Sequence, residues 1–127
     1  QKYMKKVIAT ENAPKAVGPY SQAIEVNGTL YISGQIPVNP ADGQIQTEIT
    51  AAAHQSLKNI GAILAEAGMT YDNVVKTTVL LADIADFKAV NEVYAEYFTG
   101  DKPARACYQA AALPLGVKVE IEAIAVK

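Results

Sequence analysis

The stretch from Pro103 to Ile121 contains the side chains best suited to chemistry. It includes the only arginine and the only cysteine of the chain, Arg105 and Cys107, followed by Glu120, all set among small or aliphatic residues. A guanidinium in such surroundings can bind a planar anion, such as a carboxylate, through two parallel hydrogen bonds. A purely structural interpretation also fits, in which Arg105 is a solvated strand residue, Cys107 a small buried hydrophobe and Glu120 an outward-facing charge. Local chemistry leaves both interpretations open.

Nucleophilic catalysis by Cys107 requires a neighbouring base, normally histidine. The only histidine, His54, lies in a segment predicted as helix, among Ala, Gln and Ser on its polar face, and we interpret it as solvated. Cys107 is therefore expected to contribute its main chain and its small size. One Cys and one His do not form a metal-ligand pattern, so we expect no metal and no cofactor.

Length and charge narrow the class of protein. A chain of 127 residues with a net charge of −2 and no run of basic residues fits one domain and disfavours nucleic-acid binding. No stretch approaches the roughly 18 apolar residues that span a bilayer. A single cysteine excludes an internal disulfide and fits a cytoplasmic protein. We expect the domain to occupy residues 4–127, with residues 1–3 left by an expression vector.

Alternating hydrophobicity predicts short strands in the first third of the chain, which we place at Lys5–Ala9, Ser21–Val26 and Thr29–Ser33. The last two flank Asn27-Gly28, a strong signal for a tight hairpin, because a type I′ turn needs positive φ at both central residues. Turn-forming residues indicate surface loops at Thr10–Gly18 and Pro37–Gln44.

Helical periodicity appears twice in the remainder. We expect a helix over Glu48–Ala67, capped by Thr47 and ended by Gly68, and a second helix over Asp86–Phe98, capped by Asp83 or Asp86. Strands are expected at Val74–Ala82, from Pro103 onward and at Val117–Val126, the last two joined by a turn at Pro114–Gly116.

This order predicts an α+β fold, with a largely antiparallel sheet of about six strands and two helices on one face. Val75, Val79 and Leu81 alternate with Val74, Thr78 and Leu80, which predicts two rather apolar faces for that strand. Two helices cover only one face, so the uncovered one implies a partner subunit.

Several segments resemble the Rid family, the reactive intermediate deaminases long grouped under the name YjgF. The similarity extends over nearly the whole chain and is carried by Gly18–Gln22, Ser33–Pro37, Val90–Tyr94, Pro103–Ala106 and Val119–Ile121. The chain departs from the family pattern in the short charged connection Thr99–Lys102 and at Tyr108-Gln109.

The resemblance implies a homotrimer of the chorismate-mutase-like fold, with the sheets forming a central barrel and one site in each cleft between neighbours. It implies hydrolysis of 2-imino and enamino acids (2-iminobutanoate, 2-iminopropanoate and 2-aminoacrylate) to 2-oxo acids and ammonia. These reactive compounds are products of pyridoxal-phosphate-dependent dehydratases acting on threonine and serine.

The resemblance also implies roles for individual residues. Arg105 would bind the substrate carboxylate, backbone groups at Cys107 would hold the attacking water, and Glu120 would assist that water. In a partly apolar cleft, burial would raise the pKa of Glu120 toward the range useful for proton transfer. Substrate-binding positions carried over from the family segments are Tyr20, Ser33, Gly34 and Asn91.

Two other functions stay open. A non-catalytic module that binds small carboxylates would use the same Arg105. Endoribonuclease or translation-inhibitor activity has been attributed to some relatives, but the acidic charge and the lack of a histidine acid/base pair argue against it.

Overall fold

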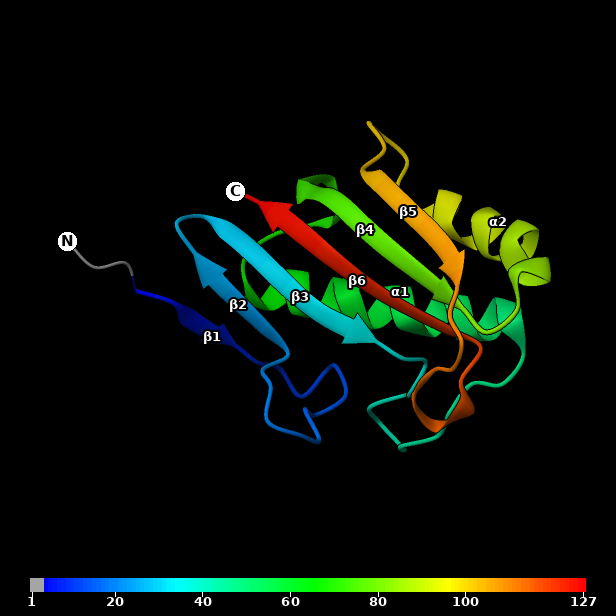
Figure 1. Ribbon diagram of the computed structural model, residues 1–127. Helices are drawn as coiled ribbons and strands as arrows, with labels where there is room; N and C mark the ends of the chain where they lie inside the picture. Colours follow the sequence, from blue (N-terminus) through cyan, green and yellow to red (C-terminus); the bar gives the residue numbers. More distant parts are fainter. Residues whose placement is uncertain (1–3) are drawn as a thin grey trace.

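One mixed sheet backed by two helices makes up the fold (Figure 1), which confirms the predicted α+β class. The computed structural model describes residues 4–127; the expected vector remnant, residues 1–3, lies outside the described residues. The main elements are β1 (Lys6–Ile8), β2 (Ala23–Val26), β3 (Thr29–Gln35), α1 (Ile49–Glu66), β4 (Val74–Leu81), α2 (Phe87–Tyr97), β5 (Ala104–Gln109) and β6 (Val119–Val126). Both helices lie on the same side of the sheet.

The six strands follow the order β1-β2-β3-β6-β4-β5. All neighbours are antiparallel except β4 and β5, which are parallel because the chain crosses over through α2 between them. The β2–β3 hairpin turns at Asn27 and Gly28, whose φ values of 52° and 81° confirm the predicted turn. The strand that carries Arg105 is thus an edge of the sheet.

The last two strands are not neighbours, because β4 lies between β5 and β6. A 3₁₀ turn at Pro114–Gly116 connects them, with Leu115 in the left-handed region at φ 57°. The connection therefore carries the chain past the end of β4 and separates Arg105 from Glu120 by two strand positions.

Apolar side chains of α1 fill the space between helix and sheet. Leu57, Ile60 and Leu64 are fully buried on the helix, as are Val79 and Ile121 on the facing strands. The helix begins one residue later than Thr47 would place it: the carboxylate of Glu48 caps it by accepting hydrogen bonds from the N–H groups of Thr50 and Ala51. These hydrogen bonds lower the pKa of Glu48.

The face assignment of Val75 was wrong. A register shift between Val74 and Lys76 adds a residue to β4, so Val75 is 48% exposed while Val79 and Leu81 are fully buried under the helices. The open face of the sheet consequently mixes aromatic and aliphatic side chains with charged and hydroxyl groups: Tyr31, Lys76, Thr78, Glu122 and Ile124 surround one shallow depression.

Neither helix within residues 4–127 is long and apolar enough to cross a membrane.

Candidate functional site

Arg105 lies on β5 opposite Thr77 of β4, so its side chain emerges on the helix-covered side of the sheet edge. Its Nη1 donates a 2.7 Å hydrogen bond to Oδ1 of Asn91 on α2. The guanidinium carbon lies 4.8 Å from the ring centroid of Tyr94 and 5.6 Å from that of Phe87. Cation–π contact and one hydrogen bond hold the group in place, while most of its five N–H donors stay available for an anion.

Tyr94 supports this arrangement from below. Its hydroxyl shares a 2.6 Å hydrogen bond with the hydroxyl of Thr77, and the ring is buried. Burial raises the pKa of Tyr94, so the ring stays neutral beneath the guanidinium. Tyr94 and Asn91, both on α2, thus contact the guanidinium of Arg105 directly.

Cys107 follows Arg105 by two residues and shares its face of β5, opposite Val79. The thiol is half-buried against the core. Burial raises its pKa, an effect that Arg105 only partly opposes. His54 is no base for it, because His54 Nδ1 lies 2.8 Å from the hydroxyl of Tyr97; His54 is therefore not the freely solvated residue that we expected.

Glu120 lies on β6 opposite Leu80, between the buried residues Val119 and Ile121, and so projects from the open face of the sheet. Its carboxyl group is half-buried. Burial raises its pKa, and the nearby charge of Glu122 raises it further. The direction is the one expected for a carboxyl group that lies in partly apolar surroundings.

Gly34 is the close neighbour of Glu120. A Cβ atom on Gly34 would lie 2.9 Å from Cδ of Glu120 and 3.1 Å from its Cγ, with one carboxylate oxygen nearer still. The register of β3 against β6 shifts here, between Ile32 and Gln35. The bulge and the missing side chain together make room for the Glu120 carboxylate beside the backbone of β3.

Ser33 lies in β3 directly before Gly34, and Tyr20 lies in the loop that follows β1. The Ser33 hydroxyl donates a 2.6 Å hydrogen bond to the carbonyl of Ser21, and the Ser33 N–H donates one to the carbonyl of Gln22. Tyr20 is 50% exposed and borders three hollows in the surface. Both residues are thus close to Gly34.

The predicted residues form two groups. Arg105, Cys107 and Asn91 belong to the helix-covered side at the β5 edge, while Glu120 and Gly34 belong to the open face. The register places Glu120 two strands from Arg105 and three residues along, a shift of roughly 10 Å in the strand direction. One chain therefore does not bring its arginine and its glutamate into a single site.

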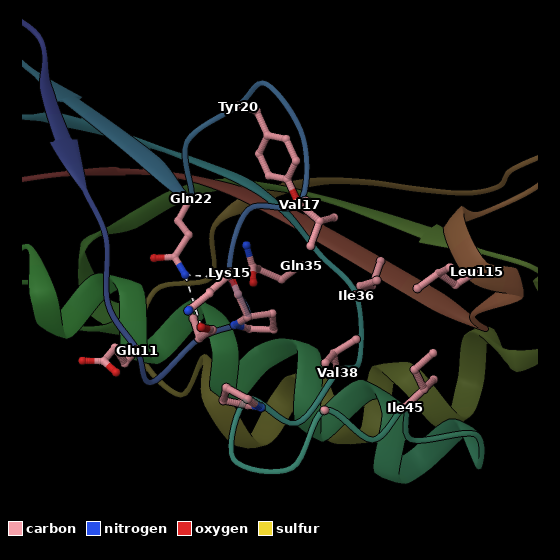
Figure 2. Close-up of a pocket in the computed structure, with 15 residues that line it drawn as sticks. Glu11, Lys15, Val17, Tyr20, Gln22, Gln35, Ile36, Val38, Ile45 and Leu115 are labelled. Atoms are coloured by element: carbon pink, nitrogen blue, oxygen red, sulfur yellow. Dashed lines mark hydrogen bonds between the residues drawn. The ribbon is translucent and has the colours of Figure 1, made fainter.

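Beside Gly34 and Tyr20 the surface opens into a pocket of about 440 Å³ (Figure 2). Its walls are two loops, residues 10–20 after β1 and residues 36–45 after β3, with Leu115 from the turn before β6. The sequence predicts both loops but not the pocket between them.

Gln22 was also missed. This buried amide donates from Nε2 to the carbonyls of Thr10, Ala13 and Pro14 at 3.0, 3.2 and 2.7 Å, and its Oε1 accepts from the N–H of Thr10 at 2.7 Å. Figure 2 shows it beneath the loop that forms one wall of the pocket. Its place in the Gly18–Gln22 segment was the only available signal, since a glutamine after a loop ordinarily faces water.

Within residues 4–127 no group of three or more His, Cys, Asp or Glu side chains is placed to hold a metal ion.

Comparison with known proteins gives a consistent result. The model of the family described as Endoribonuclease L-PSP matches residues 10–127. A mouse protein named 2-iminobutanoate/2-iminopropanoate deaminase is 58% identical over 125 residues, which cover 98% of this chain and 93% of the mouse protein. The structure of a Yersinia pestis protein of the conserved Rid family superposes with a TM-score of 0.95 at 51% identity, covering 98% of this chain and all of that one. Escherichia coli TdcF, solved with bound serine, has a TM-score of 0.93 at 43% identity, covering 96% of this chain and 98% of that one.

Proposed function

The chain belongs to the family described as Endoribonuclease L-PSP, which includes the Rid proteins, and we propose that it is a 2-iminobutanoate/2-iminopropanoate deaminase. The single observation that carries the proposal is the 58% identity with a deaminase of that name over almost the full length of both chains. The geometry around Arg105 and Glu120 fits the chemistry.

Hydrolysis of a 2-imino acid needs one water molecule and two proton transfers. The water oxygen adds to C2 as a proton reaches the imine nitrogen, which gives a carbinolamine. The C2–N bond then breaks, nitrogen leaves with a further proton as ammonia, and the hydroxyl oxygen becomes the carbonyl of the 2-oxo acid. Positioning alone lowers the barrier of so intrinsically easy a reaction by several kcal/mol.

Arg105 binds the substrate carboxylate in this proposal. The hydrogen bond to Asn91 and the ring of Tyr94 fix the guanidinium before the substrate arrives, which reduces the entropy lost on binding. Serine, the molecule bound in the structure of the Escherichia coli relative TdcF, also carries a carboxylate.

Glu120 takes a proton from the attacking water and returns it to nitrogen. A carboxyl group whose pKa is raised by burial performs both steps better than an ordinary surface carboxylate. Cys107 contributes its backbone groups rather than its thiol, because burial raises the thiol pKa. We expect Cys107→Ser to retain much of the activity, and total loss in a folded variant would contradict this role.

The complete site requires a second copy of the chain. Arg105 and Glu120 lie on different faces of one sheet, so the Arg105 group of one subunit must meet the Glu120 group of another. We propose the homotrimer implied by the family resemblance, with the open sheet faces turned toward the centre and a site in each cleft between subunits. The exposed Tyr31 and Tyr108 on the strands of each subunit support burial against a neighbour.

A coupled assay tests the function. A threonine dehydratase generates 2-iminobutanoate, semicarbazide traps the imine that remains, and the trapped fraction is measured with and without this protein. The comparison variant is Arg105→Ala, checked by circular dichroism and by size-exclusion chromatography for an unchanged oligomer. We expect the native protein to reduce trapping and the variant to have lost most of this effect; an unchanged trapped fraction with native protein would refute the deaminase.

The family description favours testing ribonuclease activity as a second candidate. The chain lacks the groups that RNA cleavage ordinarily uses. Its one histidine, His54, is hydrogen-bonded to the Tyr97 hydroxyl, and its net charge of −2 disfavours RNA binding. Incubation with a single-stranded RNA, with Arg105→Ala as control, distinguishes the candidates, because we expect no Arg105-dependent cleavage. Turnover of the imino acid separates the enzyme from a module that only binds small carboxylates.

A further inference from the structure

Glu120 has a second carboxylate beside it on the open face of the sheet. Glu122 follows it by two residues on β6, and Ile121 and Ala123, which alternate with the two glutamates, are buried on the other face. Side chains two residues apart in a strand point to the same face and lie roughly 7 Å apart along it. No step of the proposed reaction uses Glu122.

Glu122 has no ion-pair partner that would neutralise it. It lies opposite Thr78 of β4 and borders the shallow depression on the open face, where Lys76 is the only cation among the described lining residues. Lys76 lies opposite Ile124, four residues along β6 from Glu120. The one ion pair among residues 4–127 involves none of these residues. The charge of Glu122 is therefore free to act on Glu120.

The neighbouring strands place no carboxylate or cation directly beside Glu120. β4 places Leu80 opposite it, and β3 places Gly34 next to it. The other titratable groups that β3 and β5 present on the open face are the phenol groups of Tyr31 and Tyr108. Glu122 is thus the charged side chain nearest to Glu120 on this face.

Two cations remain to be considered. Lys118 precedes β6 by one residue, and its charge acts on the Glu48 carboxylate at the start of α1. In the proposed trimer, Arg105 of a second subunit faces Glu120. An arginine beside a carboxylate favours its charged form, which would make Glu120 a weaker base, whereas a second carboxylate acts in the opposite sense.

We propose that Glu122 is a positioning residue that acts through Glu120: its charge keeps the Glu120 carboxylate able to accept a proton from water beside the arginine that binds the substrate. The raised pKa of Glu120 agrees with this role, because burial raises it and the charge of Glu122 raises it further. The inference rests on the proposed deaminase function and adds a residue that controls protonation at the same site.

Glu122→Gln removes the charge and keeps the shape of the side chain. Glu120 should then lose its proton at lower pH, so kcat/KM for 2-iminobutanoate should rise on the acid limb of the pH–rate profile. Two unit charges roughly 7 Å apart interact in bulk water by a factor of about three, so the gain at low ionic strength should be at least about threefold. On the plateau the variant should be slower than the native protein, because a less basic carboxylate takes a proton from water less readily. The two profiles should therefore cross.

The kinetic test uses the full chain and the trapping assay over a range of pH. The dehydratase is kept in excess at each pH, and the uncatalysed hydrolysis of the imine is subtracted. Glu122→Lys reverses the charge and should move the acid limb further in the same direction as Glu122→Gln. The matched control is Glu66→Gln, which makes the same change of charge at an exposed position at the end of α1 and should leave the profile unchanged.

Salt distinguishes an effect of charge from an effect of conformation. Raising the ionic strength from about 0.01 M to about 1 M shortens the screening length from about 30 Å to about 3 Å. Glu122 is exposed, so the difference between the native and Glu122→Gln profiles should largely disappear at the higher salt concentration. A difference that persists there would overturn control by charge.

A second measurement does not depend on turnover. The side-chain carboxyl resonance of Glu120 is followed by 13C NMR as the pH changes, and it is assigned by its absence from Glu120→Gln. We expect its titration midpoint to lie at lower pH in Glu122→Gln than in the native protein, and to be unchanged in Glu66→Gln. Size-exclusion chromatography with light scattering records the subunit number of every variant.

The outcomes separate this proposal from the proposed function. Equal titration of Glu120 in the native protein and in Glu122→Gln overturns the proposal whatever the kinetics show. A loss of kcat/KM by one factor at every pH, an unchanged profile, or a changed subunit number in Glu122→Gln also overturns it and leaves the deaminase standing. A shifted titration of Glu120, in a native protein that turns over no imine, would refute the deaminase and keep the control of Glu120 by Glu122.

Discussion

Gly34→Ala should inactivate the protein without unfolding it. The new Cβ would lie 2.9 Å from Cδ and 3.1 Å from Cγ of Glu120, with a carboxylate oxygen closer still, so the carboxyl group must turn away. The atoms that must move are the far end of a flexible side chain. The cost to the folded state is therefore that of one unfavourable rotamer, up to about 1.5 kcal/mol in the free energy of unfolding.

The effect on catalysis should be much larger. General acid–base catalysis contributes about 100- to 10,000-fold, and a Glu120 carboxyl group turned out of position forfeits it. We therefore expect kcat/KM for 2-iminobutanoate to fall at least about 100-fold. The matched control is Gly18→Ala, whose Cβ would meet Tyr20 ring carbons at an ordinary 3.5 Å, and which should keep its activity.

A double-mutant cycle tests whether Gly34 acts through Glu120. Glu120→Gln removes the ionisable group, so adding Gly34→Ala to it should cause little further loss of kcat/KM. The measurements are the trapping assay for activity and guanidinium denaturation for stability. The reasoning would be refuted if the fold losses of kcat/KM in the two single variants multiplied in the double variant. A fully active Gly34→Ala would refute it as well.

The remaining predictions concern the supports of the fold and the site. Gly61→Ala should lower the free energy of unfolding by about 1–3 kcal/mol, because its Cβ would lie 2.7 Å from Cζ of Tyr71. Adding Tyr71→Phe removes the hydroxyl group and should recover part of this loss. Denaturation curves of the two single variants and the double variant measure the effect, and no recovery would exclude the hydroxyl group as the obstacle. Asn91→Ala should raise KM more than it lowers kcat, because the side chain orients Arg105 without touching the reacting atoms; steady-state kinetics measure the split, and an unchanged KM would contradict the role. Burial raises the pKa of Glu120, so the stability linked to its proton is present below the ordinary glutamate pKa of about 4.3 and is lost as pH rises through the raised value. The native protein should therefore lose unfolding free energy relative to Glu120→Gln as the pH rises above the ordinary glutamate pKa, and parallel pH curves of the two proteins would contradict the raised pKa.

Local signals predicted the elements well where they were strong. Asn27-Gly28 specified its hairpin because few other residue pairs accept positive φ at both positions. The helical period predicted each end of α1 to within one residue, but its cap was misplaced by one residue, since both Thr47 and Glu48 can accept from the first N–H groups. The register shift between Val74 and Lys76 leaves no mark in the hydrophobic pattern, so Val75 was assigned to the wrong face.

The site was predicted as a set of residues and not as an arrangement. The family segments named Arg105 and Glu120, but their separation depends on β4 lying between β5 and β6, which is a property of the strand order. Gln22 escaped notice because burial of an amide beneath an irregular loop follows from tertiary contacts alone. The residue types thus revealed the chemistry, while the positions of the groups required the fold.

The division of the site between the two faces of the sheet also has a genetic consequence. A chain with Arg105→Ala lacks one group and keeps the other, and a chain with Glu120→Gln has the opposite defect. In the proposed trimer, a mixed assembly of the two contains clefts in which an intact Arg105 group meets an intact Glu120 group. Two inactive alleles in one cell should therefore complement each other, whereas two alleles altered on the same face should not.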